Sequence, residues 1–317
     1  MAIFFFVVGL AVRREMHRGE LSGWRRAALP AAAALGGMLA PTALYLALAG
    51  HATTRAGWGV PMATDIAFAV GILTLLGRRV PASLRVLLLA LAAIDDLGAI
   101  IVIALFYSSG VAFSGMAVAG AGIASIVTWH ALRVRSKLAH VPPVLVVWGG
   151  VHAAGIHPAI VGVLVELATP VRTRPGSDGE TIPSPTENLI EALHPWIAFG
   201  IMPVSALANA GVVVSSRSTD ARATSVTVAV ALGLVVGRPA GALAASWLAT
   251  RGRVASVPRG IGMRHMVVLG IVAGVGFTMA LFGAQLAFAD VGLLVAAKLG
   301  VLAASGLSAV PGLGVAR

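Results

Sequence analysis

Two adjacent carboxylates, Asp95 and Asp96, lie inside an apolar run that covers residues 89–105. A run of this kind is typical of a membrane-spanning helix, and apolar residues flank the pair on both sides. A carboxylate at bilayer depth costs at least about 2.5–3.5 kcal/mol, so such residues are rare and usually functional. Neighbouring residues on a helix point about 100° apart, so one carboxylate can face a water-filled cavity while the other faces a neighbouring helix. The pair therefore predicts an ion-linked or proton-linked site rather than the N-cap of a helix.

The composition supports a membrane location. Hydrophobic residues make up 58% of the 317 residues and charged residues only 11%, whereas soluble domains carry about 25% charged residues. Long stretches of strand-like alternation are missing from the sequence, so helices are favoured over a barrel. The net charge of +11 would suit nucleic acid, but basic residues also collect in the cytoplasmic loops of membrane proteins. We therefore expect an all-α polytopic membrane protein with no nucleic-acid partner.

The apolar segments predict ten membrane spans, preceded by a shorter fragment at residues 1–12. The ten spans are 27–49, 62–77, 84–107, 111–130, 141–154, 156–170, 193–214, 225–249, 266–289 and 291–310. The stretch 171–188 is the longest loop and is polar. Most of the 23 Lys and Arg residues fall on one side of these spans, which places this loop and the C-terminus in the cytoplasm. The fragment 1–12 is too short to cross a bilayer, so we expect either that Met1 is not the physiological start or that the chain is a truncated product.

Two of these spans are interrupted by polar or glycine residues. Residues 62–77 contain Thr64 and Asp65, and residues 266–289 contain Thr278 after several glycines, including Gly276. Each is the middle member of three consecutive spans, and the two would cross the membrane in opposite directions. Paired interrupted spans are typical of inverted-repeat transporters that bind their substrate near the membrane midplane. Loose glycine packing between helices is the alternative explanation.

Several motifs in the same order cover nearly the whole chain. They are ATDIAFAVG at 63–71, AIDDLGAI at 93–100, LHPW at 193–196, ANAG at 208–211, GVGFTM at 274–279 and AKLG at 297–300. Together they resemble the NhaA family of sodium/proton antiporters, which are known examples of inverted-repeat transporters. The resemblance implies one transmembrane domain over residues 1–317, with two crossing, interrupted helices, in the inner membrane of a bacterium. It also implies exchange of cytoplasmic Na⁺ or Li⁺ for external H⁺, no cofactor, contact with the lipid bilayer and a homodimer.

The resemblance also implies roles for individual residues. Asp96 matches the principal sodium ligand and proton acceptor, and Asp95 matches a neighbour that exchanges partners with a basic residue. Thr64 and Asp65 match the broken-helix residues beside the ion, where Asp65 would balance the charge of helix ends. Positions tied to the pH response of the family are Glu15, His157 and His194.

This chain departs from the family pattern in three ways. The first family helix and half of the second are missing, and Ala11 replaces a Glu. Arg238 stands where the family usually has an intramembrane Lys, and we expect it to be a counter-ion for Asp95 or Asp65. Since an arginine in a protein does not lose its proton, a mechanism in which this base carries a transported proton does not suit this chain.

Two other functions compete with antiport. An intramembrane aspartyl protease could use Asp65 with Asp95 or Asp96 as its catalytic dyad. However, none of these aspartates lies in the Gly-x-Gly-Asp element expected of such an enzyme. A shortened homologue that no longer transports is the second alternative. We favour a sodium/proton antiporter that controls pH and sodium, and we do not expect an enzyme.

Overall fold

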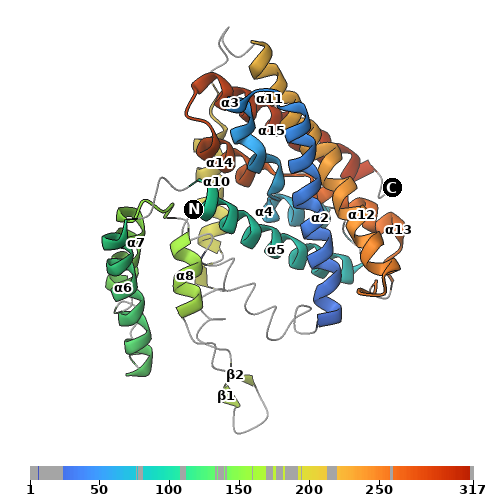
Figure 1. Cartoon of the computed structure of the whole chain (residues 1–317). Coiled ribbons are helices and arrows are strands. Elements are labelled where there is room, and N and C mark those ends of the chain that lie inside the picture. Colours follow the sequence, from blue (N-terminus) through green and yellow to red (C-terminus); the bar gives the residue numbers. More distant parts are fainter. Residues whose placement is uncertain are drawn as a thin grey trace. The chain divides into compact units, whose positions relative to one another are not determined.

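The computed structural model of the chain consists almost entirely of helices (Figure 1). The residues that it describes are 6, 24–75, 77, 81–107, 112–132, 134, 139, 141–158, 160–168, 174–175, 181–182, 192–193, 195–212, 220–257 and 260–314. The chain forms two compact units. The first comprises Met1–Arg13 and Ile100–Val204, and the second comprises Arg14–Ala99 and Ser205–Arg317. All the charged residues expected at the ion site belong to the second unit.

Within the described residues, four helical segments are long and apolar enough to cross a membrane. They are Ala27–Leu48, Ala82–Phe106, Ala221–Arg251 and Val291–Ala309. The helices that contain them are α2 (Trp24–Leu48), α5 (Ala82–Phe106), the continuous run of α11 (Ala221–Leu232), η7 (Gly233–Gly237) and α12 (Arg238–Arg251), and α15 (Val291–Gly314). The chain is thus a multi-pass membrane protein.

Two further spans are broken helices. The first consists of α3 (Ala52–Arg55), η2 (Ala56–Met62) and α4 (Ile66–Leu75), and it bends by 46°. The second consists of α13 (Met263–Ala273) and α14 (Phe277–Ala287), and it bends by 44°. These bent pairs raise the number of spans among the described residues to six and confirm the expected all-α fold with two interrupted helices.

The first broken span differs from the sequence expectation in one respect. Residues 62–77 were expected to form the segment, with Asp65 close to its start, but the helical structure already begins at Ala52. The preceding residues contain Gly and Pro, which favour turns. Tertiary contacts override that preference, because the buried Tyr45 hydroxyl donates a hydrogen bond to the Thr54 carbonyl at 2.6 Å. Asp65 consequently lies in the middle of a broken span.

The described part of the first unit contains shorter elements. They are α6 (Phe113–Ala131), α7 (Val141–Ala153), α8 (Ile160–Ala168), β1 (Arg174–Pro175), β2 (Thr181–Ile182), η5 (Ile197–Ile201) and the first residues of α10 (Met202–Ala210). Helices α6 and α7 pack closely, since a Cβ atom on Gly115 would lie 2.2 Å from the backbone nitrogen of Ala154. Strands β1 and β2 pair antiparallel inside the stretch expected to be a polar loop.

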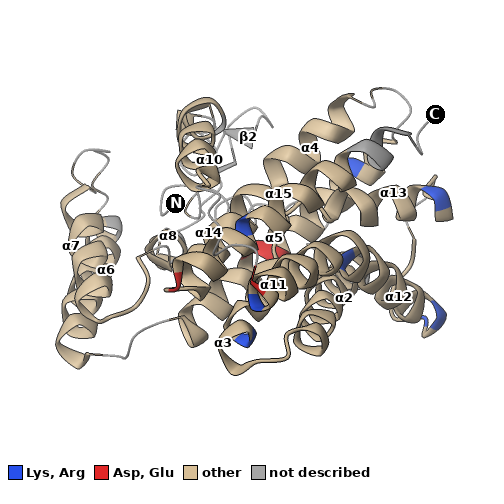
Figure 2. Cartoon of the chain, turned by 90° about the horizontal axis from the view of Figure 1, so that it is seen from above, with Lys and Arg blue, Asp and Glu red and all other residues tan. Residues whose placement is uncertain are grey.

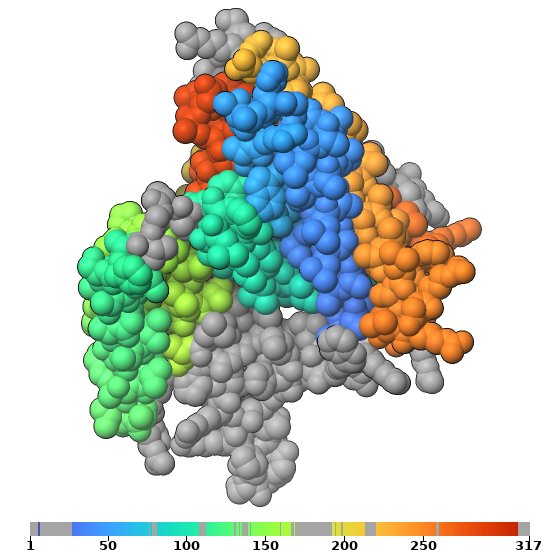
Figure 3. Space-filling model, in the orientation of Figure 1, coloured from blue at the N-terminus to red at the C-terminus, as the bar shows by residue number. Residues whose placement is uncertain are grey.

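Small residues bring α2 and α12 together in the second unit. A Cβ atom on Gly36 would lie 2.2 Å from the Gly241 carbonyl oxygen, and one on Gly241 would lie 2.1 Å from the Gly36 carbonyl oxygen. Glycine permits this approach because it has no side chain. The two helices therefore run side by side, in blue and orange in Figures 1 and 3.

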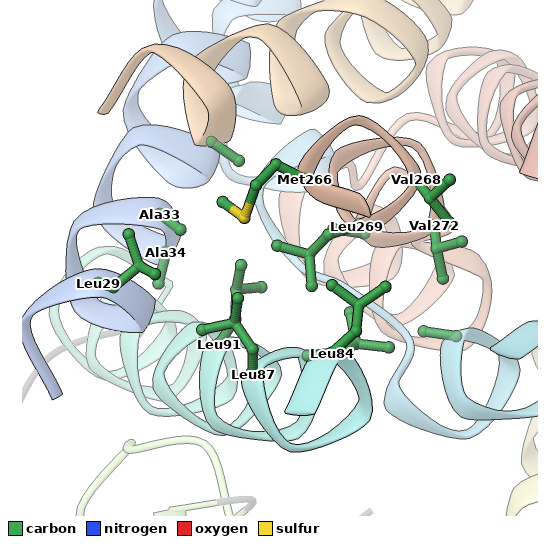
Figure 4. Packing of buried hydrophobic residues seen from close by; sticks show 14 of the residues in the cluster. Leu29, Ala33, Ala34, Leu84, Leu87, Leu91, Met266, Val268, Leu269 and Val272 are labelled. Carbon is green, nitrogen blue, oxygen red and sulfur yellow. The ribbon is translucent and has the colours of Figure 1, made fainter. Parts of the chain in front are cut away.

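A buried apolar cluster fixes α5 between α2 and α13. It includes Leu29 of α2, Leu87 and Leu91 of α5, and Leu269 of α13, as Figure 4 shows. Asp95 follows Leu91 by one helical turn. The cluster thus anchors the α5 segment that carries the acidic pair.

Candidate ion-binding site

The interruptions of the two broken helices lie against each other. Residues 63–65 and 275–276 are not helical, and the Asp65 backbone N–H donates to the Val275 carbonyl at 2.8 Å. A Cβ atom on Gly276 would lie 2.9 Å from the Ala63 carbonyl oxygen, so a side chain there would separate the two breaks. Non-helical backbone at membrane depth is tolerated only where protein or water surrounds it. We call the place where the breaks at 63–65 and 275–276 meet the crossing. It brings four helix ends, each with unsatisfied backbone groups, into one buried region.

Asp65 caps two of these ends at once. Its Oδ1 accepts from the backbone N–H of Phe68 at 3.1 Å, which is the usual N-cap bond at the start of α4. Its Oδ2 accepts from the backbone N–H of Thr278 at 2.9 Å and from the Thr278 hydroxyl, at the start of α14. The N-terminal ends of helices carry partial positive charge, so the fully buried Asp65 carboxylate is balanced by both.

Arg238 and Thr64 serve the other two ends, which carry partial negative charge. The guanidinium of Arg238 donates to the carbonyl of Met62, the last residue of η2. The Thr64 hydroxyl lies 3.1 Å from the carbonyl of Ala273, the last residue of α13. The carbonyls of Met62 and Ala273 therefore each have a donor beside them.

Asp95 is held by the same two residues. Its Oδ2 forms an ion pair with Arg238 and lies 2.9 Å from the Thr64 hydroxyl, which also accepts a bond from Arg238. A hydroxyl has one proton, so Thr64 donates either to Asp95 or to the Ala273 carbonyl, but not to both. The pairing answers a question that the sequence left open, because Arg238 pairs with Asp95 rather than with Asp65.

A distorted helical turn places the Arg238 side chain. The five residues of η7 form a π-helix directly before Arg238, and such turns occur often at functional sites. Pro239 follows Arg238 and has no backbone N–H, so the regular series of α-helical hydrogen bonds is interrupted here. A Cβ atom on Gly237 would lie 2.8 Å from Pro41, so this turn packs directly against α2.

Asp96 is different from the other two aspartates. It is fully buried, and neither of its carboxylate oxygens has a hydrogen-bond partner within the described residues. The Oδ1 atom of Asp95 also has no hydrogen-bond partner within the described residues. Buried carboxylate oxygens are very costly unless a proton, a cation or a hydrogen-bond donor satisfies them. Figure 2 shows acidic residues, in red, on α5, among helices drawn almost entirely in tan.

The described residues contain no group of three or more His, Cys, Asp and Glu side chains arranged to hold a metal ion. Asp65 directs its oxygens to helix ends, so the unpartnered carboxylate oxygens of this region in the described residues belong to Asp95 and Asp96. Oxygen ligands of this kind suit hard cations.

The crossing unites seven of the residues singled out from the sequence. They are Thr64, Asp65, Asp95, Asp96, Arg238, Gly276 and Thr278. His157 is half-buried between α7 and α8 in the first unit, while Glu15 and His194 lie outside the described residues. Sequence reasoning missed the carbonyls of Met62 and Ala273, because a backbone group leaves no mark in a sequence.

A family model described as "Na+/H+ antiporter 1" matches residues 1–315. The chain belongs to this family. It is 58% identical to "Na(+)/H(+) antiporter NhaA 2" of Myxococcus xanthus (strain DK1622), over 100% of this chain and 75% of that protein. It is 49% identical to "Na(+)/H(+) antiporter NhaA" of Acidovorax sp. (strain JS42), over 99% of this chain and 75% of the relative. The resemblance found in the motifs is confirmed, and nothing supports the protease alternative.

Proposed function

We propose that this chain exchanges cytoplasmic Na⁺ for external H⁺ across a bacterial inner membrane, and that Asp96 is the group that binds them in turn. Membership of the Na⁺/H⁺ antiporter family supports the transported ions. The observation that carries the assignment of the site is the pair of buried Asp96 oxygens without a partner among the described residues. Li⁺, a smaller ion of the same charge and ligand preference, is proposed as a second substrate.

Competition for one carboxylate is sufficient for exchange. When Asp96 holds Na⁺, the buried negative charge is compensated by the cation; when it holds H⁺, the charge is removed. Since an empty, charged Asp96 is strongly disfavoured away from water, only the two loaded forms readily change the side to which the site opens. The Oδ1 atom of Asp95 is also without a partner in the described region and is proposed as a second oxygen ligand of Na⁺.

Thr64, Asp65 and Thr278 hold the crossing together in this proposal. Their hydrogen bonds join the two broken spans, so the four half-helices can shift as a unit around the ion. Movement of one repeat against another around a fixed site is the usual basis of alternating access. Gly276 contributes by letting the two breaks approach closely.

The remaining expectations concern regulation and assembly. We propose that the half-buried His157 contributes to a pH response, since histidine titrates in the physiological range, and that Glu15 and His194 take part with it. A cytoplasmic C-terminus follows from the distribution of basic residues. A homodimer in the lipid bilayer and the polar cytoplasmic loop at 171–188 stay proposals drawn from the sequence.

Asp96→Asn tests the assignment. Asparagine keeps the shape of the side chain but neither carries a charge nor titrates, so Na⁺-dependent H⁺ movement in everted membrane vesicles should disappear. The matched control is Asp290→Asn, because Asp290 is an exposed N-cap of α15 and its replacement should leave transport unchanged. Transport by Asp96→Asn at the wild-type rate would show that the ion binds elsewhere. A wild-type chain that inserts but moves no ions would favour the transport-inactive alternative.

A further inference from the structure

We infer that Arg238 holds Asp95 as a fixed ion pair throughout the transport cycle, so that one proton is exchanged for each Na⁺ and no net charge crosses the membrane. This inference rests on the proposed function. It adds a stoichiometry to that function and assigns Arg238 as the positioning residue that sets it.

Arg238 is bound from several directions inside the crossing. It is fully buried, and its guanidinium donates to the Asp95 carboxylate, the Thr64 hydroxyl and the Met62 carbonyl. These partners come from α5, from the break and from the end of η2. The rigid fork of a guanidinium can serve several acceptors together, which the single ammonium group of a lysine does with less geometric precision.

Release of Asp95 from this arrangement would isolate a buried positive charge. If Asp95 accepted a proton, the guanidinium would lose its counter-ion, and breaking a buried pair by removing one partner is strongly destabilising. A lysine can avoid this penalty by losing its own proton, whereas an arginine remains charged. The Asp65 carboxylate is occupied by the starts of α4 and α14 and cannot replace Asp95.

Charge conservation then determines the stoichiometry. The Arg238–Asp95 pair and the capped Asp65 keep the same charge in both loaded forms. Asp96 carries Na⁺ in one form and a covalently bound H⁺ in the other, so the two forms have equal net charge. One complete cycle moves one Na⁺ outward and one H⁺ inward. If Asp95 also gave and took a proton, two H⁺ would enter for each Na⁺, and the membrane potential would drive the exchange.

The balance point of the purified, reconstituted chain distinguishes these two cases. At zero membrane potential, an about tenfold Na⁺ gradient is balanced by about one pH unit for one proton per Na⁺, and by about half a unit for two. An imposed potassium diffusion potential shifts the balance only if net charge moves. We expect balance near one unit, unaffected by the potential. Balance near half a unit, or a shift with potential, would overturn the inference while leaving antiport intact.

A substitution tests whether Arg238 is the cause. Arg238→Lys retains the positive charge but introduces a base that can lose its proton, so transport should become sensitive to the membrane potential. The control is Arg222→Lys on α11, which is exposed and should leave the balance point unchanged. A merely structural role for Arg238 would alter rate or stability without moving the balance point, and that result would contradict the assignment.

Proton release in detergent gives a second measurement that needs neither vesicles nor a complete cycle. Addition of Na⁺ to the purified wild-type chain in weakly buffered, alkali-titrated solution should displace no more than one proton per bound Na⁺. Two protons per Na⁺ would refute a fixed Asp95. Wild-type protein that binds no Na⁺ and moves no ions would remove the proposed function and the stoichiometry together.

Discussion

Replacement of Asp65 by alanine tests whether one carboxylate holds the two broken helices together. The substitution removes the acceptor for three donors: the backbone N–H groups of Phe68 and Thr278 and the hydroxyl of Thr278. Two of these donors belong to the unsatisfied first turns of α4 and α14. The change therefore uncaps two helices in a buried region at the same time.

The expected loss follows from those bonds. Loss of one N-cap lowers stability by about 0.5–2 kcal/mol, and a buried donor left without a partner costs about 1–3 kcal/mol. We expect Asp65→Ala to lower the free energy of unfolding by about 2–4 kcal/mol, since two caps are lost. Asp65→Asn should fall between alanine and wild type, because its single amide oxygen can cap only one of the two helices.

Thermal and denaturant unfolding in a single detergent provide the assay, and Asp290→Ala provides the matched control. Asp290 caps α15 through the backbone N–H of Leu293 at 2.9 Å, which is the same register as the bond from Phe68 to Asp65. It is exposed and caps one helix, so its loss should be about 0.5–2 kcal/mol. If Asp65→Ala destabilises the protein no more than Asp290→Ala does, the double capping of the crossing is refuted.

Variants at Arg238 and at Gly36, each with its own control, probe the packing of the second unit by the same unfolding measurements. Arg238→Met should destabilise the protein by about 3–5 kcal/mol because Asp95 would be buried without its partner. The double variant Arg238→Met/Asp95→Leu should regain most of that stability. A double variant no more stable than Arg238→Met would contradict the pairing. Gly36→Ala should cost about 1–3 kcal/mol, because its Cβ would lie 2.2 Å from the Gly241 carbonyl oxygen. Gly71→Ala, with nothing within 4 Å, should be neutral or stabilising, and equal effects of the two glycine changes would refute the tight contact.

The sequence predicts the membrane class and the site because charges inside apolar runs are conspicuous. Asp95 and Asp96 predict a functional helix by their position alone. The interruption at Asp65 and the glycines before Thr278 indicate broken helices. Non-helical backbone at membrane depth must be buried in protein or line a cavity, so these breaks also point to the interior of the molecule. Those signals depend on local composition, which any single sequence displays.

Other features depend on contacts between distant segments and so leave weaker signals. Nothing in the sequence decides whether Arg238 pairs with Asp65 or Asp95, because the choice depends on the π-helical turn of η7 and its packing on Pro41. The helical structure of residues 52–62 is also hidden, since their turn-forming composition is overridden by tertiary hydrogen bonds. Local preference is a weak guide wherever packing supplies the larger energy.

The three aspartates at the crossing differ in what compensates their buried charge, and this difference sets Asp96 apart from the other two. Asp65 is balanced by the starts of two helices, and Asp95 by a guanidinium whose charge is permanent. Asp96 has no partner for its carboxylate among the described residues. A buried carboxylate must be compensated, and we propose that the compensating partner of Asp96 is an ion from outside the protein. In the proposed exchange, H⁺ and Na⁺ both meet that need at the same two oxygens, so arrival of one ion would require departure of the other.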